Sequence, residues 1–375
     1  MDAAIKNNIH MVSLLLNAGV DVNAQDDEGW TALHHAVEKN MIELTALLLQ
    51  QPAIDVTMKR RWGDTPLHIA AREDLSGKLV AMLLQAGAHY NSKTKSGGST
   101  PLSNAIHHKN IEATRLLIAV GANVNINHYS FLDYCTKYQG YHDNRLEVAQ
   151  LLLRAGIIVD RVEKTDGRYI DMTPLKYAIV GNDHEMVALL AHYGADVNAV
   201  IKYKGREHLN QNILFYAINQ GYLEMVKTLL KFGVVVDTIK SKKQRFIDMT
   251  ELQLAVGVKD LESASLLIAY GANPHALLKI EQGDKIREIS TLGLAILVKS
   301  VAAVDLLYRA GVALDGIKIS DQYIIDVSGL GFPRAGDDKE MISILTSGGA
   351  QISTSNGPLK LNFTSIFYKI FSKRG

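Results

Sequence analysis

A short apolar pattern recurs along the chain and closes each time on a glycine. Two or three leucine-like residues precede two spacers and the glycine, as in Leu151–Leu153 before Gly156. Apolar residues at this spacing predict an amphipathic helix, and a glycine that accepts a left-handed backbone predicts the end of that helix. Copies follow one another roughly every 34 to 40 residues. The glycines are Gly19, Gly87, Gly121, Gly156, Gly194, Gly233, Gly271, Gly311 and Gly349, and Pro52 stands in their place in the second copy.

A second pattern stands about 21 residues before each glycine and predicts a shorter helix. Its clearest copy is Thr65-Pro66-Leu67-His68, in which the threonine side chain can cap the helix and the proline suits its first turn. Small residues such as Ala70 follow and allow a neighbouring helix to approach closely. Since the two patterns keep one offset, they predict about ten helix–turn–helix repeats. The capping position holds Thr31, Thr65, Thr100 or Thr173 in clear copies and Ser130, Asn212, Thr250, Ser290 or Ser328 in weaker ones.

Stretches between the repeats alternate apolar and polar residues and lead into a polar turn, which predicts a β-hairpin finger. One such stretch, Gly194–Asn198, together with Thr65–Ala71 and Gly121–Asn125, resembles the ankyrin-repeat family. The resemblance implies L-shaped repeats stacked into a curved, all-α-dominated solenoid. It also implies a binding face on the concave side, formed by the finger tips and by the first helix of each repeat.

We expect the solenoid to span residues 1–353, with a cap-like repeat at 1–25, regular repeats at 26–125 and diverged repeats at 126–353. In the diverged repeats the segment between each glycine and the next helix cap is longer, which predicts elongated β-hairpin fingers. Two interpretations stay open: the long fingers bind a partner, or they pair with one another and stiffen the array. Residues 354–375 form a tail.

The last repeat and the tail depart furthest from the pattern. Glycines and a proline interrupt the first helix of the tenth repeat between Gly329 and Gly336, and terminal repeats of solenoids are often atypical. The tail carries an apolar stripe at helical spacing, which favours a helix that seals the end of the solenoid. A membrane-surface helix and a sorting signal are the alternatives. The stripe consists of Phe363, Ile366, Phe367, Ile370 and Phe371.

Composition and charge narrow the class of function. Hydrophobic residues make up 47% of the chain and charged residues 21%, which supports a folded core. The formal net charge is +1, so the chain lacks the broad positive field that attracts nucleic acid or anionic membranes. Cys135 is the only cysteine, which excludes an intrachain disulfide and fits a reducing compartment. Since no apolar run reaches the ~18 residues of a membrane span, we expect a cytoplasmic monomer.

Residue types that take part in catalysis occur without the partners that they need. Cys135 takes the slot that Ala70 and Ala178 take in other repeats, so we expect a buried structural thiol. Histidines such as His34 and His68 fall in the first-helix pattern, where the resemblance implies hydrogen bonds between repeats. No phosphate-binding loop occurs, and the repeats occupy nearly the whole chain. We expect no enzyme activity, no metal and no cofactor.

Partner binding is expected at residues that the repeat pattern does not fix. Both tryptophans precede helix caps in early fingers, where they either contact a partner or pack the hairpins; aromatic and arginine side chains dominate binding hot spots. Two late fingers are basic, and some first-helix residues face the expected concave side. The candidates are Trp30, Arg60, Arg61 and Trp62 in early fingers, Lys202, Tyr203, Lys204, Arg206, Lys240, Lys242, Lys243, Arg245 and Phe246 in late fingers, and Arg72, His107, Tyr177 and Tyr216 on first helices.

The sequence therefore favours a non-catalytic scaffold or adaptor that binds another protein on its concave or finger face. One alternative is an anion-binding module that holds RNA or a phosphoinositide on the basic fingers. Another is a secreted bacterial or viral effector that binds a host protein in the host-cell cytoplasm. Strong salt dependence of binding would indicate the anion-binding module, because phosphate contacts weaken steeply as salt rises.

Overall fold

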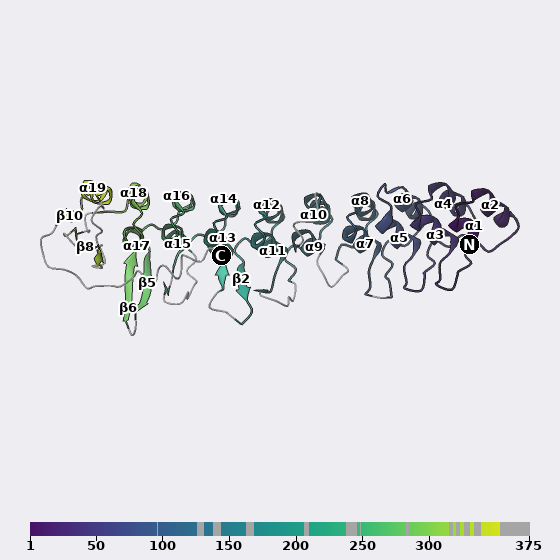
Figure 1. Cartoon of the computed structure of the whole chain (residues 1–375), viewed down its shortest axis with the longest axis horizontal. Helices are drawn as coiled ribbons and strands as arrows, with labels where there is room; N and C mark the ends of the chain where they lie inside the picture. Colours follow the sequence, from purple (N-terminus) through teal and green to yellow (C-terminus); the bar gives the residue numbers. More distant parts are fainter. Residues whose placement is uncertain are drawn as a thin grey trace. The chain divides into compact units, whose positions relative to one another are not determined.

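The computed structural model (Figure 1) describes residues 1–95, 97–125, 131–137, 144–162, 169–205, 210–237, 246–247, 249–282, 285–314, 318–319, 323–325, 331–333 and 339–352. The chain divides into two compact units, Met1–Arg161 and Val162–Gly375. In each of them successive helices pair and stack. The fold class expected from the sequence, an all-α-dominated repeat solenoid, is thus confirmed within each unit.

In the described part of the N-terminal unit the helices occur in pairs. They are α1 (Asp2–Ile5) with α2 (Ile9–Asn17), α3 (Ala32–Glu38) with α4 (Ile42–Leu49), α5 (Pro66–Glu73) with α6 (Lys78–Gln85), α7 (Pro101–His107) with α8 (Ile111–Ala119), and α9 (Phe131–Lys137) with α10 (Arg145–Arg154). The first helix of each pair packs on its second helix and also on the first helices of the neighbouring pairs, for example α5 on α3 and α7.

The C-terminal unit continues the same helix pairing. Its pairs are α11 (Pro174–Val180) with α12 (His184–His192), α13 (Ile213–Gln220) with α14 (Leu223–Lys231), α15 (Glu251–Gly257) with α16 (Leu261–Ala269), and α17 (Thr291–Leu297) with α18 (Val301–Arg309), followed by α19 (Lys339–Ser347). Within this unit the first helices α11, α13, α15 and α17 lie between the row of second helices and the strands β2 (Val200–Tyr203), β5 (Leu277–Gln282) and β6 (Lys285–Ser290) (Figure 1).

Strands occur in the long fingers of the C-terminal unit. One sheet has the order β1 (Tyr169–Ile170), β2 (Val200–Tyr203), β3 (Gln211–Asn212), and a second has the order β4 (Phe246–Ile247), β5 (Leu277–Gln282), β6 (Lys285–Ser290). Strands β5 and β6 form the longest hairpin of the described residues, with Leu277 paired to Ser290. The pairs β1–β2 and β4–β5 join neighbouring fingers. This pairing matches the interpretation in which long fingers stiffen the array, and their role in binding stays a prediction.

The tenth repeat departs from the others as the sequence indicates. Strand β9 (Gly331–Pro333) lies where the other repeats have their first helix, and it pairs with β8 (Tyr323–Ile325). Strand β8 also pairs with β7 (Lys318–Ile319), which in turn pairs in parallel with β10 (Gln351–Ile352). The predicted tail, residues 354–375 with its apolar stripe, lies outside the described residues.

Four of the predicted caps form hydrogen-bonded boxes, at Thr31, Thr65, Thr100 and Thr250. In the second repeat the His34 amide donates to Thr31 Oγ1 (3.3 Å), and the Thr31 amide donates to His34 Nδ1 (3.2 Å). The same exchange uses the Gln253 side chain at Thr250, whose amide donates to Gln253 Oε1 (3.0 Å). Each box satisfies two of the amide groups that the start of a helix leaves without intrahelical partners.

The core lies between the helices of neighbouring repeats. Second-helix leucines such as Leu83, Leu117 and Leu229 are 0% exposed, as are small first-helix residues such as Ala105 and Ala178. Burial of the leucines contributes stabilising apolar area, and the small residues allow the first helices to approach closely. The repeat pattern therefore fixes the core and leaves the finger tips free to vary.

Candidate functional site

Neighbouring fingers of the N-terminal unit are joined at their tips. We call residues 18–31, 50–65 and 86–100 the first, second and third fingers. The Arg61 amide donates to the Glu28 carbonyl (2.9 Å), and the Lys95 amide donates to the Trp62 carbonyl (3.0 Å). Gly63 has φ +90°, and a Cβ atom added there would lie 2.6 Å from the Lys95 nitrogen, so the close approach requires glycine. The tips therefore form one connected surface within this unit.

Trp30 packs into that surface. Its ring stacks on His35 at 4.9 Å between centroids with an interplanar angle of 18°. The Arg60 guanidinium lies 4.9 Å from the same ring, and Arg60 Nε also donates to Asp64 Oδ2 (3.0 Å). Trp30 and Arg60 thus hold the first and second fingers together, which corresponds to the packing interpretation of this tryptophan.

Trp62, in contrast to Trp30, is largely exposed to solvent. Its side chain is 56% exposed, and no other Trp, Tyr or Phe in the described part of the N-terminal unit is exposed. The Arg61 guanidinium lies 5.8 Å from its ring centroid. Arg61 Nη1 also reaches Glu28 Oε1 at 3.2 Å, and both side chains of this pair are more than half exposed. A solvent-exposed ion pair of this kind contributes about 0–1 kcal/mol, so Arg61 remains available to a partner.

Charge changes sign from one finger to the next. The first finger carries Asp21, Asp26, Asp27 and Glu28 and no lysine or arginine. The second and third fingers expose basic side chains, namely Lys59, Arg61, Lys93 and Lys95. Neither of the third-finger lysines forms an ion pair with another described residue. Sequence reasoning missed them, although the repeat offset places Lys95 beside Arg61.

First-helix candidates of the N-terminal unit adjoin the fingers. Arg72 Nε donates to Glu73 Oε1 (2.6 Å) at the end of α5. His107 is exposed at the end of α7, its ring stacks on Tyr134 at 4.7 Å between centroids, and its carbonyl accepts from the Tyr134 hydroxyl (3.1 Å). Both side chains thus remain in reach of solvent while making local contacts.

Two tyrosines named as candidate contacts, Tyr203 and Tyr216, are buried, and their role in partner binding stays a prediction. Tyr216 is 5% exposed and Tyr203 is 8% exposed. The Tyr203 ring lies 5.1 Å from that of Tyr169, and its hydroxyl accepts from Gln211 Nε2 (3.0 Å). Burial, with Tyr169 nearby, raises the pKa of the Tyr216 hydroxyl far above its usual range. The strands of the long fingers fold over this part of α13, which the helix pattern alone does not reveal.

The late basic fingers are described only in part. Lys202 Nζ donates to Asp171 Oδ2 (2.8 Å), which lowers the pKa of that carboxyl, and Lys204 is exposed. Tyr177, on α11, is half-buried. Phe246 is placed by its backbone in β4, paired with Ile280. The candidates Arg206, Lys240, Lys242, Lys243 and Arg245 lie outside the described residues.

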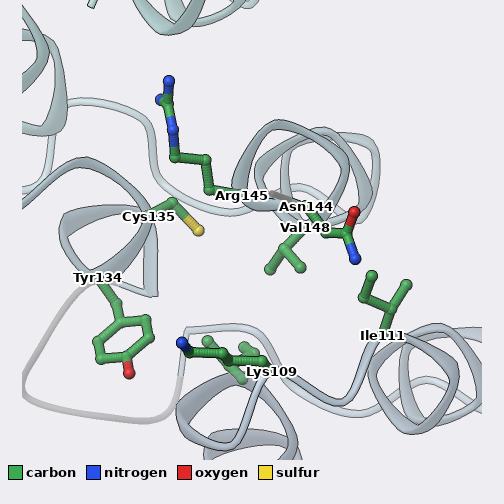
Figure 2. Close-up of a pocket in the computed structure, with 8 residues that line it drawn as sticks. Lys109, Ile111, Tyr134, Cys135, Asn144, Arg145 and Val148 are labelled. Atoms are coloured by element: carbon green, nitrogen blue, oxygen red, sulfur yellow. The ribbon is translucent and has the colours of Figure 1, made fainter. Parts of the chain in front are cut away.

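A small hollow lies between the α7–α8 and α9–α10 pairs. Figure 2 shows the Cys135 side chain directed toward Val148, with Tyr134 from the same helix and Lys109 below it. Its interior volume is ≈ 20 Å³, room for about one water molecule and not for an organic cofactor. The Cys135 thiol is 2% exposed, so its prediction as a buried residue is confirmed.

The capping histidines link repeats, as the resemblance implies. Nδ1 of His34 and of His68 accepts from the cap threonine, so Nε2 carries the proton and donates to the next finger, at Asp64 O (3.4 Å) and Ser99 O (3.2 Å). Burial lowers the pKa of His34 to about 4 and also lowers that of His68. Among the described residues no three His, Cys, Asp or Glu side chains converge as metal ligands, and none of the described helices is long and apolar enough to cross a membrane.

Comparison with known proteins adds a family relationship. A family model for ankyrin repeats in three copies matches residues 1–94 and 76–163, and a model for a single ankyrin repeat matches residues 171–202. The B-cell lymphoma 3 protein homolog of Mus musculus is 30% identical over 215 residues, which is 56% of this chain and 45% of that protein. The nuclear factor NF-kappa-B p105 subunit of Gallus gallus is 47% identical over 83 residues, 22% of this chain and 8% of that protein.

Among solved structures, an ankyrin repeat domain from Acinetobacter baumannii is similar at 29% sequence identity and a TM-score of 0.46. The match covers 51% of this chain and 95% of that one. The chain spans less than half the length of the two curated relatives named above.

Proposed function

The chain belongs to the ankyrin-repeat family, and from this premise we propose that it is a non-catalytic scaffold that binds another protein through the finger tips of its N-terminal unit. Ankyrin repeats are general protein–protein interaction modules. The proposal adds a location: the partner contacts Trp62 and the basic side chains around it. The single buried cysteine fits binding in a reducing compartment, and we place the complex in the cytoplasm.

The observation that carries the proposal is the 56% exposure of Trp62. Full burial of a large apolar side chain stabilises a fold by about 1.5–3 kcal/mol, and a tryptophan that stays half in water forgoes part of that stabilisation. Trp30, on the neighbouring finger, is covered by His35 and Arg60. Tryptophan and arginine are enriched among the few residues that dominate binding energy at interfaces. Covering Trp62 with a partner recovers the apolar area that folding leaves exposed.

Site-specific crosslinking tests the location. A photoreactive phenylalanine analogue replaces Trp62 in one variant and Tyr270, which is 51% exposed in the C-terminal unit, in a control variant. After irradiation in a eukaryotic cell lysate, we expect a covalent protein adduct from position 62 and none from position 270. The Trp62→Ala variant, which carries no photoreactive residue, should fail to bind the same partner and should keep the melting temperature of the wild-type chain. Equal amounts of crosslinked protein from both positions would contradict the proposal. A large decrease in the melting temperature of Trp62→Ala would contradict it too.

A further inference from the structure

We propose that the partner segment that covers Trp62 is an acidic peptide with an apolar side chain that packs on the Trp62 ring. This inference rests on the proposed function, since it names the chemistry of a partner at the same surface. We call Lys59, Arg61, Trp62, Lys93 and Lys95 the basic tip surface. All five side chains are exposed.

The fold brings positive charges of two fingers to the tip that carries Trp62. The backbone bond from Lys95 to Trp62 and the close approach of Gly63 to the Lys95 nitrogen fix where the third finger passes the tryptophan. Closer to the helices, Lys59 Nζ donates to the Lys93 carbonyl (3.1 Å) and also links the second and third fingers. Carboxylates on a peptide that packs on the ring would thus meet cations of both the second and the third finger.

Among the described residues, neither acidic residue of these two fingers, Asp55 or Asp64, forms an ion pair with the basic tip surface. The Asp55 carboxylate accepts from the Thr57 amide (2.8 Å) and hydroxyl (2.6 Å), and these bonds lower the pKa of Asp55. Asp64 pairs with Arg60, which lies over Trp30 and not at the tip surface. The exposed contact of Arg61 with Glu28 is weak and can exchange for a carboxylate of a partner.

The first finger favours a peptide over a nucleic acid. Asp26, Asp27 and Glu28 lie on the tip beside the basic tip surface, and the Arg61 amide bonds directly to the Glu28 carbonyl. A nucleic acid carries one phosphate per nucleotide, so its negative charges would also lie against these carboxylates. A peptide can place acidic residues over the second and third fingers and neutral or basic residues over the first. Charge complementarity therefore selects a short acidic segment.

Tryptophan fluorescence gives a local readout, because the chain has two tryptophans and Trp30→Phe leaves Trp62 as the only one. The probes are a 12-residue peptide (roughly half Glu and Asp with one central Leu), the same peptide with Gln and Asn for the acids, the same with Lys for the acids, and a 12-nucleotide uridine RNA. We expect the acidic peptide to shift the Trp62 emission to shorter wavelength and to bind at least about tenfold more tightly than the amide peptide at low salt.

Two triple variants in the same background assign the charges. The test variant carries Arg61→Gln, Lys93→Gln and Lys95→Gln, and the control carries Lys6→Gln, Lys78→Gln and Lys231→Gln, which are exposed lysines elsewhere. Both variants lose three positive charges. We expect about tenfold weaker binding of the acidic peptide only in the test variant, with the circular dichroism of both variants unchanged.

Each outcome decides the inference. Equal affinities for the acidic and amide peptides, or equal losses in both triple variants, overturn it. A shift of Trp62 emission by the RNA but not by the acidic peptide overturns both the inference and protein binding at this surface. If crosslinking at position 62 captures a protein while the acidic peptide fails to bind, the proposed function stands and the acidic partner is wrong.

Discussion

Protonation of His34 is expected to destabilise the N-terminal unit as the pH falls from about 6.5 toward 4. The imidazole is fully buried, and its Nδ1 accepts from the Thr31 amide (3.2 Å) and lies 2.8 Å from the Thr31 hydroxyl. A proton on Nδ1 would place N–H against N–H at this cap and would put a charge in the interface with the second finger. The perturbation to test is His34→Gln, because Gln253 already fills the same slot in the eighth repeat and donates to Ala276 O (3.0 Å).

The direction of the pH effect follows from which state, folded or unfolded, binds the proton more readily. Burial lowers the folded-state pKa of His34 to about 4 from 6.5, so between these values the unfolded chain binds more protons than the folded one. Stability from neutral His34 is therefore complete above pH 6.5 and is lost as the pH falls toward 4. At about 1.36 kcal/mol per pKa unit, the whole effect is about 3 kcal/mol. His68, whose pKa is lowered in the same direction, adds to it.

Urea denaturation between pH 7.5 and 4.5 measures the effect, and emission from Trp30 and Trp62 reports the N-terminal unit in which both lie. The wild-type chain, His34→Gln and a control, His10→Gln at an exposed position of α2, are compared. We expect the free energy of unfolding to decrease between pH 7.5 and 4.5 in the wild type and in the control. In His34→Gln this decrease should be about 2–3 kcal/mol smaller. Carboxylates titrate equally in all three chains. Parallel pH profiles for the wild type and His34→Gln would refute the reasoning.

Three further outcomes follow from the structure. Leu229→Ala should lower the free energy of unfolding by about 2–5 kcal/mol through cavity formation at a 0% exposed site; an unchanged urea midpoint would mean that this helix face is misassigned. Gly63→Ala should destabilise by about 1–3 kcal/mol more than Gly87→Ala, because only at Gly63 would the new Cβ meet neighbouring backbone; equal melting temperatures would count against the tight tip contact. Serine at the four lysine and arginine positions of residues 240–245 should leave the partner captured by the intact chain unchanged in a pull-down, and its loss would move the binding surface to that finger.

The helices could be predicted because each boundary has a local cause. Thr100 caps α7, and Pro101 at its first position fits the predicted turn. Gly121 has φ +88° just after α8, as a helix-ending glycine requires. The elongated hairpin of β5 and β6 was also predictable, from the longer alternating segment before α17. These features depend on residues within one repeat, which sequence patterns report directly.

The candidate contacts were harder to predict because exposure depends on neighbouring repeats. Trp30 and Trp62 both precede a helix cap, yet Trp30 follows its tip glycine, Gly29, whereas Trp62 precedes Gly63. After its glycine, the Trp30 ring lies against His35 and Arg60, whereas before its glycine the Trp62 ring stays in water. Alignment on the tip glycines would have separated the two tryptophans. Burial of Tyr216 by the long fingers has no such local signal.

The division between fixed and free positions explains why the Trp62 side chain can change without breaking the contacts that hold the fold. Folding of the N-terminal unit uses the cap threonines, the buried leucines and the glycines, and at the second finger tip it uses the backbone carbonyl of Trp62, not its ring. Any side chain at position 62 keeps that hydrogen bond. A residue whose side chain the fold does not use can change with the partner while the scaffold stays constant, and stacked repeats contact only their neighbours. Partner specificity in this chain is therefore expected to lie at tip positions such as 61, 62 and 95 and not on the helices that hold them.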